Sequence, residues 1–206
     1  MTESESLFED VLNVRGIIYR KIPEDVIRTP DYEVILDVGK TYWEVKELEE
    51  NRLEKSILTD IISGKCNGYS GVDSNRVVNS IKEACDQFKK YGVQDNPCVI
   101  VLYDSRDFFV QDFLFTSSIK SALFGPSTYV ENSIGELVEL SRKYGLLTNR
   151  KRYVSAVGVL YSGSGDLSIY HNPYTSNPLT YNSLSAFHNQ FIAIESKNGL
   201  VWEKIK

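Results

Sequence analysis

Cysteine and histidine are scarce in this sequence. The three cysteines, Cys66, Cys85 and Cys98, form no C-x-x-C pair, which argues against a disulfide scaffold and against a zinc knuckle. Cys85 and Cys98 fall within apolar segments, so we interpret them as core thiols. The two histidines, His171 and His188, lie far apart and have no acidic neighbours at ligand spacing, which argues against a histidine-based metal site.

Long hydrophobic runs are also missing. The longest apolar runs, such as Cys98–Tyr103, are far shorter than the roughly 20 residues that a membrane-spanning helix needs. The first residues are acidic and polar, and no basic region is followed there by an apolar one, so no secretory signal is visible. We therefore expect a cytoplasmic protein without membrane association.

The composition is that of a folded domain. Of 206 residues, 42% are hydrophobic, with only 6 prolines and 13 glycines, which excludes a disordered or collagen-like chain. The 23 basic and 28 acidic residues give a net charge of −5. This charge argues against a non-specific nucleic-acid coat, but not against an enzyme that holds a divalent cation. No repeat or linker divides the chain, so we expect one domain over residues 1–206.

Hydrophobic spacing predicts an α/β fold. The elements expected in the first half are a helix at 4–14, a strand at 16–22, a β-hairpin of residues 31–37 and 40–48, helices near 51–62 and at 74–91, and a buried strand at 97–103. Those expected in the second half are helices at 109–124 and 133–144 and strands at 153–161, 166–171, 189–195 and 199–204. This order fits a mixed β-sheet sandwiched by helices, with residues 106–206 as an extension packed on a core of residues 1–105.

The predicted hairpin gathers charge on one face. Because strand side chains alternate, Asp31 and Glu33 share a face with Glu44 and Lys46, while the opposite face is apolar. A two-residue turn at Val38-Gly39 would place Asp31 opposite Lys46 and Glu33 opposite Glu44. Like charges in opposite positions are destabilising unless they are compensated, and a divalent cation would compensate them. Asp37 is a turn residue in this interpretation, about 20 Å along the strand from Asp31.

The same residues carry a resemblance to a known family. Pro30-Asp31, a gap of twelve residues and then Glu44-Val45-Lys46 resemble the PD-(D/E)xK (restriction-endonuclease-like) nuclease superfamily. In that family a helix precedes the hairpin, and a helix and a buried strand follow it. Residues 1–104, about half the chain, match this α-β-β-β-α-β order.

The resemblance implies an activity and a cofactor. Asp31 and Glu44 would hold Mg²⁺, with Mn²⁺ as the alternative ion, and the Val45 carbonyl would also ligate it. Lys46 would activate the water that attacks a phosphodiester bond, in DNA more readily than in RNA. A further acidic residue on the first helix is matched by Glu9, with Glu5 as the alternative.

Further residues are candidates for binding nucleic acid. Some exonucleases of the family carry a Gln-x-x-x-Tyr stretch, which Gln87 and Tyr91 match, although Tyr91 can equally be a packing residue. Basic side chains on the polar side of the same helix are candidates for phosphate contacts, with an ordinary solvated surface as the alternative. They are Arg76, Lys82, Lys89 and Lys90. The basic run at 149–152 is either a backbone contact or a surface loop.

One further motif can be set aside from the sequence, and two other interpretations remain open. A second E-x-K triplet, Glu195-Ser196-Lys197, is a decoy, because only nine residues follow it and no Pro-Asp precedes it on a hairpin partner. His171 precedes a proline turn and is either a general acid or base or a turn cap. The chain can also be a catalytically inactive nucleic-acid-binding or assembly module of the same fold, and in either case a homodimer is a possible assembly.

Overall fold

The computed structural model of the protein describes residues 1–24, 28–65, 74–106, 115–161, 166–196 and 199–205. The elements of the first half are α1 (Glu3–Val14), β1 (Ile18–Lys21), β2 (Tyr32–Leu36), β3 (Gly39–Leu48), α2 (Arg52–Ile62), α3 (Ser74–Tyr91) and β4 (Cys98–Asp104). Those of the second half are α4 (Phe115–Phe124), β5 (Ser127–Glu131), β6 (Leu137–Arg142), α5 (Leu146–Asn149), β7 (Val154–Leu160), β8 (Leu167–His171), a 3₁₀ turn (Asn182–Leu184), β9 (Asn189–Ser196) and β10 (Gly199–Lys204).

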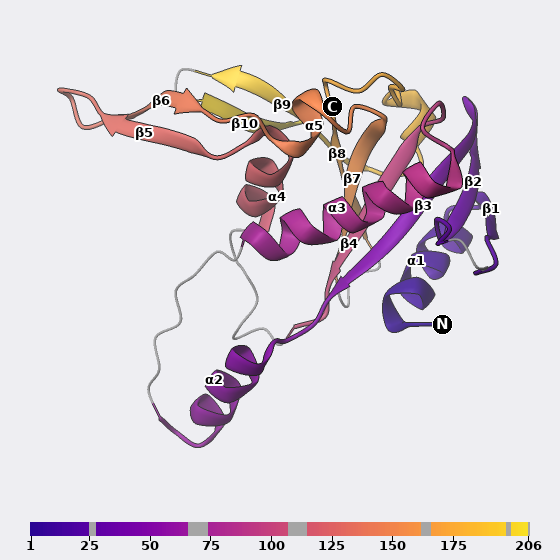
Figure 1. The fold of residues 1–206 in the computed structure, drawn as a ribbon, viewed down its shortest axis with the longest axis horizontal. Coiled ribbons are helices and arrows are strands. Elements are labelled where there is room, and N and C mark those ends of the chain that lie inside the picture. The colour runs from indigo at the N-terminus through magenta and orange to yellow at the C-terminus, as the bar shows by residue number, and fades with distance from the viewer. Residues whose placement is uncertain (25–27, 66–73, 107–114, 162–165, 197–198, 206) are drawn as a thin grey trace.

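One eight-stranded mixed sheet contains strands from both halves of the chain (Figure 1). Its order is β1-β2-β3-β4-β7-β8-β9-β10. The pairs β3–β4, β4–β7 and β8–β9 are parallel, and the other neighbouring pairs are antiparallel. The expectation of an α/β fold with a mixed sheet between helices is confirmed at this level.

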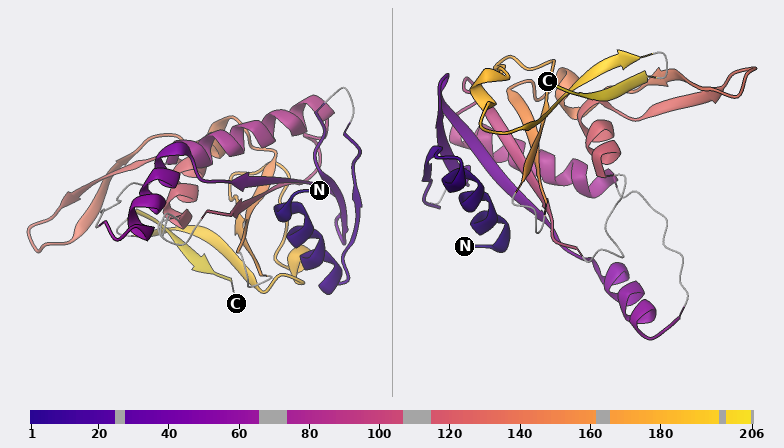
Figure 2. Two further views of the ribbon diagram at one scale, coloured as in Figure 1. Left: turned by 90° about the horizontal axis from the view of Figure 1, so that it is seen from below. Right: turned by 180° about the vertical axis from the view of Figure 1, so that it is seen from behind.

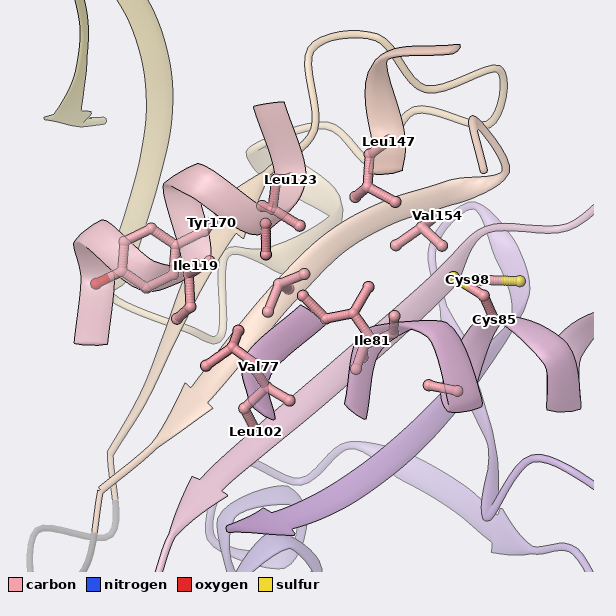
Figure 3. Close-up of a cluster of buried hydrophobic side chains, with 14 of the residues drawn as sticks. Val77, Ile81, Cys85, Cys98, Leu102, Ile119, Leu123, Leu147, Val154 and Tyr170 are labelled. Carbon is pink, nitrogen blue, oxygen red and sulfur yellow. The ribbon is translucent and has the colours of Figure 1, made fainter. Parts of the chain in front are cut away.

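Helices cover both faces of the sheet, and each face has its own core. The left view of Figure 2 shows α3 on one side of the central strands and α1 on the other. On the α1 side, Phe8 and Leu12 pack with Tyr32 and Trp43, and all four are fully buried. On the α3 side the cluster in Figure 3 joins α3 and α4 to β4, and it includes Cys85 and Cys98 as free buried thiols. Their prediction as core thiols is confirmed, and Cys66 lies outside the described residues.

The helix ends follow from local chemistry. A capping box starts α1, because the Thr2 hydroxyl accepts from the Glu5 N–H while the Glu5 carboxylate accepts from the Thr2 N–H. Gly92, at φ 79°, follows the end of α3, where a left-handed residue is needed to close the helix. Within the described residues, no helix combines the length and apolar content needed to cross a bilayer.

The helix predicted at 133–144 is wrong. β5 and β6 form a separate antiparallel hairpin there, which projects from the body of the molecule (Figure 1). Its turn is stabilised by Asn132, whose side-chain oxygen accepts from the N–H groups of Ile134 and Glu136, and by Gly135 at φ 81°. An asparagine side chain that caps the turn and a glycine at positive φ favour a hairpin over a helix. Of the helix predicted at 109–124, only Phe115–Phe124 falls within the described residues.

Candidate active site

The β2–β3 hairpin has a different register from the predicted one. Tyr32 lies opposite Trp43 and Leu36 lies opposite Gly39, so the two-residue turn is Asp37-Val38 and not Val38-Gly39. Gly39 begins β3 at φ 102°, a conformation that favours glycine. Continuing this register places Asp31 opposite Glu44, two residues from the predicted pairing. Because the shift is even, every side chain keeps its predicted face.

The predicted Glu33–Glu44 contact is therefore wrong. Glu33 lies opposite Tyr42, and its carboxylate forms ion pairs with Arg20 at 3.2 Å and Lys40 at 3.2 Å. These two cations neutralise Glu33 in place of a bound metal ion. The acidic patch is thus smaller than the sequence suggested, and its carboxylates are those of Asp31 and Glu44.

Asp31 and Glu44 are joined by reciprocal hydrogen bonds. The Glu44 carboxylate accepts from the Asp31 N–H at 3.1 Å, and the Asp31 carboxylate accepts from the Val45 N–H at 2.7 Å. Glu44 is 1% exposed, whereas Asp31 is half-buried at the start of β2. Two carboxylates from neighbouring strands thus lie on the same face, at the end of the hairpin next to Pro30.

The Val45 carbonyl points to the same edge of β3 as the Val45 N–H. In a β-strand the N–H and C=O of one residue point to the same edge, and the Val45 N–H points to Asp31. Pro30 precedes Asp31 and has no N–H to donate to that carbonyl. By this geometry the Val45 carbonyl points toward the β2 side of β3, where Asp31 lies.

Lys46 is held between a carboxylate and an amide. Its ammonium lies 2.7 Å from the Glu44 carboxylate and donates to the Gln87 side-chain oxygen at 2.6 Å. Gln87, on α3, is itself fixed because its amide donates to the Thr29 carbonyl at 3.2 Å. Gln87 was predicted to bind nucleic acid, and the structure places it as a support for Lys46 instead. Tyr91 packs edge-on against Tyr42, with ring centroids 6.0 Å apart.

The charges at this face perturb each other strongly. Burial, followed by the neighbouring charge of Asp31, raises the pKa of Glu44 to about 8, despite the opposing effect of Lys46. Burial also raises the pKa of Asp31, more than the Val45 hydrogen bond and Lys46 lower it. Perturbed carboxylates in a cavity are a feature of functional sites, and a bound cation would favour the charged form of both.

A cavity of about 450 Å³ opens beside Asp31, Lys46 and Gln87, while the buried Glu44 lies behind its lining. Its described lining comes entirely from the first 105 residues and consists of Glu24, Arg28, Thr29, Asp31, Lys46, Glu83 and Gln87. Sequence reasoning missed Glu24, Arg28, Thr29 and Glu83. The signal for Glu83 was its position one helical turn before Gln87 on α3, which places the two side chains on one stripe.

Glu9 lies apart from this cavity. Its carboxylate accepts hydrogen bonds from the hydroxyls of Tyr32 at 2.9 Å and Tyr19 at 3.4 Å, and Tyr32 belongs to the core on the α1 face. The structure therefore does not bring Glu9 to Asp31. Glu5, the alternative on the same helix, is near enough for its charge to raise the pKa of Asp31, and it is paired with Lys21 at 2.9 Å.

The side chains predicted to bind nucleic acid do not lie together on one surface. Arg76 forms an ion pair with the buried Glu54 at 2.9 Å and donates to the Glu49 carbonyl, so it already has partners within the protein. Lys90 is exposed at the end of α3, and Lys82 is exposed and lines a different cavity from Asp31.

The remaining candidates are distant from the site or have structural roles. His171 is buried, and one of its ring nitrogens lies 2.8 Å from the Gln190 side-chain oxygen. Burial lowers the pKa of His171. Lys151 pairs with Asp86, and Arg152 donates to the Tyr174 carbonyl. Lys197 of the second E-x-K triplet lies outside the described residues.

A divalent cation fits the donors at Asp31 and Glu44. The described residues include no group of three or more His, Cys, Asp and Glu that could hold a metal ion. Mg²⁺, however, commonly binds through one or two carboxylates and keeps several waters. Two facing carboxylates with raised pKa, together with the Val45 carbonyl, meet that requirement. No protein-family model matches the chain, and neither curated proteins nor solved structures gave a match.

Proposed function

We propose that this protein is a metal-dependent nuclease of the PD-(D/E)xK type that hydrolyses phosphodiester bonds, in DNA rather than RNA. The observation that carries the proposal is the convergence of Asp31, Glu44 and Lys46 on one face of the β2–β3 hairpin, beneath a polar cavity. These three residue types at these positions are the ones that the family resemblance requires.

The order of the elements supports the same conclusion. A helix, a three-stranded antiparallel meander, two helices and a strand parallel to the third strand follow one another in the first half. This order is compatible with the α-β-β-β-α-β core that the resemblance implies, with α2 as an addition before α3. The likeness rests on connectivity and on the motif together, and fold alone would not establish an activity.

The side chains divide the chemistry between them. Asp31, Glu44 and the Val45 carbonyl would hold Mg²⁺, which when bound polarises the phosphodiester and lowers the pKa of a water. An ammonium has three N–H donors, and Lys46 directs two of them at Glu44 and Gln87. The third is available to the cavity, where it can orient the attacking water or stabilise charge on a phosphate oxygen.

A cleavage assay tests this proposal. Linear, circular and single-stranded DNA, and RNA, are incubated with the protein in Mg²⁺, in Mn²⁺ and in EDTA. We expect cutting that requires the metal and falls at least about 100-fold in Lys46→Ala, the usual scale for loss of a proton-transfer group. Lys55→Ala, an exposed lysine on α2 that does not line the cavity, is the matched control and should cut normally. Metal-independent cutting, or cutting retained in Lys46→Ala, would refute the proposed site.

One observation favours the alternative of a non-catalytic assembly module. The β5–β6 hairpin exposes apolar side chains, including Ile134 at 75%, Leu137 at 59% and Leu140 at 66%. A two-stranded hairpin is marginally stable by itself in water, and exposed apolar groups of this kind mark interaction surfaces. A folded protein that neither cuts nucleic acid nor binds Mn²⁺, but self-associates through this hairpin, would support that alternative.

A further inference from the structure

A second cavity lies on another side of α3 from the candidate site. It has a volume of about 380 Å³ and is lined by α3, α4, the base of the β5–β6 hairpin and α5. Val78 and Lys82 reach it from one stripe of α3, whereas Glu83 and Gln87 reach the candidate site from a neighbouring stripe. The width of one helix therefore separates the two cavities.

This second cavity has the opposite electrostatic character. Among its described lining residues, Lys82 and Arg150 are cationic and none is a carboxylate, in a chain with a net charge of −5. Both cations are exposed, and neither side chain forms a hydrogen bond or ion pair with another described residue. Two free cations that converge on one cavity without a counter-charge are suited to a phosphate group.

The other lining groups are suited to the rest of a nucleotide. The Ser121 hydroxyl and the Asn149 amide add polar contacts, and Val78 and Leu146 add apolar ones. Tyr144 lies at the rim of the cavity and is 82% exposed, which is unusual for an aromatic residue. Exposed aromatic rings beside cationic groups are the stacking platforms of single-stranded nucleic-acid binding.

We propose that this cavity binds the phosphate and base of a nucleotide that flanks the bond to be cut. The inference rests on the proposed nuclease function. An α-helix is about 10–12 Å wide with its side chains, and a strand of duplex DNA advances about 3.4 Å per nucleotide. A strand crossing α3 from the candidate site therefore reaches Lys82 and Arg150 about three to four nucleotides away.

The test measures binding of fluorescein-labelled oligonucleotides by fluorescence anisotropy in EDTA, which prevents metal-dependent cutting. The variants are Lys82→Glu, Arg150→Glu and the double variant. The control is Lys204→Glu, an exposed lysine on β10 that lines neither of the two cavities. Circular dichroism and thermal melting check that all of them fold.

We expect the double variant to bind at least about tenfold more weakly at 0.1 M salt, and the slope of log affinity against log salt to fall by about two, one for each lost phosphate contact. The loss should be larger with strands long enough to span both cavities than with shorter ones. Lys204→Glu should bind like the wild-type protein. Unchanged binding by the double variant would overturn the inference.

Titration with a mononucleotide and with inorganic phosphate separates this inference from the proposed function. If the wild-type protein binds no oligonucleotide but the double variant loses binding of the mononucleotide, the phosphate site is real and its ligand is a free nucleotide. That result would refute the proposed nuclease function and leave the phosphate site standing. If the wild-type protein binds neither an oligonucleotide nor a mononucleotide, the inference is overturned.

Discussion

Asp31 and Glu44 fix each other's positions through the backbone. The Glu44 carboxylate accepts from the Asp31 N–H at 3.1 Å, and the Asp31 carboxylate accepts from the N–H that directly follows Glu44 in the chain at 2.7 Å. Each carboxylate thus keeps oxygen lone pairs for another partner, since a carboxylate offers about four acceptor sites. The pair is ordered before any ion arrives, and this preorganisation underlies the first two predictions.

Metal binding should release a proton. Because burial and Asp31 raise the pKa of Glu44 to about 8, a cation must displace a proton from this carboxyl at neutral pH. We expect the affinity for Mn²⁺ to rise by about tenfold per pH unit from pH 6 toward pH 8, then to level off, because one proton is exchanged. Isothermal titration calorimetry in buffers of different ionisation enthalpy measures both quantities. A pH-independent affinity would contradict this prediction.

Without metal, the stability of the protein should decrease as the pH rises. A carboxyl whose pKa is higher in the folded state binds more protons when folded, so its stabilising effect is lost between its unfolded pKa, about 4.5, and about 8. We expect a contribution of up to about 1.4 kcal/mol per pH unit over this window. Urea unfolding in EDTA at several pH values measures it, and Glu44→Gln should lack this component. Equal pH profiles for both proteins would refute the assignment to Glu44.

Gln87 should act through Lys46 and not through nucleic acid. Its side-chain oxygen accepts from Lys46 at 2.6 Å while its amide is bound to the Thr29 carbonyl. Given the proposed activity, Gln87→Ala should lower kcat by about 10–100-fold, the effect of misplacing a reacting group, with little change in KM. Asn79→Ala, on the exposed side of α3, is the control. A rise in KM alone would restore the interpretation of Gln87 as a nucleic-acid contact.

The ion network under α2 should be important for stability. Glu54 is fully buried and accepts from Arg76 at 2.9 Å and Arg106 at 3.1 Å. Glu54→Gln removes the counter-charge of Arg76 and one of the two carboxylates paired with the buried Arg106, which keeps Asp104 at 2.7 Å, so we expect a loss of about 3 kcal/mol in the free energy of unfolding.

The matched control for Glu54 is an exposed ion pair. Asp86, 60% exposed, pairs with Lys151, and Asp86→Asn should cost less than about 1 kcal/mol because solvent screens such pairs. Chemical denaturation measures both variants. Similar losses of unfolding free energy in the two variants would show that the buried ion pairs of Glu54 do not stabilise the protein more than an exposed pair does.

The sequence predicted the faces of the hairpin better than its register. Alternation decides which side chains lie together, and it was sufficient to bring Asp31, Glu44 and Lys46 to one surface. The turn position was not decidable, because Asp37-Val38 and Val38-Gly39 both offer two-residue turns. The conformation of Gly39 selects between them, and it depends on the pairing itself. The register error was even, so the faces were preserved, and only the predicted pairings of Glu33 with Glu44 and of Asp31 with Lys46 were wrong.

Tertiary contacts explain the other differences. The polar side of α3 can be recognised in the sequence, but the roles of its side chains depend on elements that are distant in the sequence. Arg76 forms an ion pair, Gln87 supports Lys46, and Lys82 lines a separate cavity. The helix predicted at 133–144 is wrong because a turn stabilised by Asn132 and Gly135 outweighed apolar spacing in a segment that is mostly exposed. Hydrophobic periodicity reflects the burial of side chains against a core, and a hairpin that projects from the domain buries few of its side chains.

The position of β4 has a consequence for any attempt to shorten the protein. β4 lies between β3, which carries Glu44 and Lys46, and β7, which comes from the second half. Its residues Cys98–Tyr103 are all buried. A fragment ending at residue 105 would expose the unpaired edge of an apolar strand, which invites intermolecular pairing and aggregation. The residues that form the candidate site therefore need the second half of the chain as their folding partner, although that half contributes none of the described side chains lining its cavity.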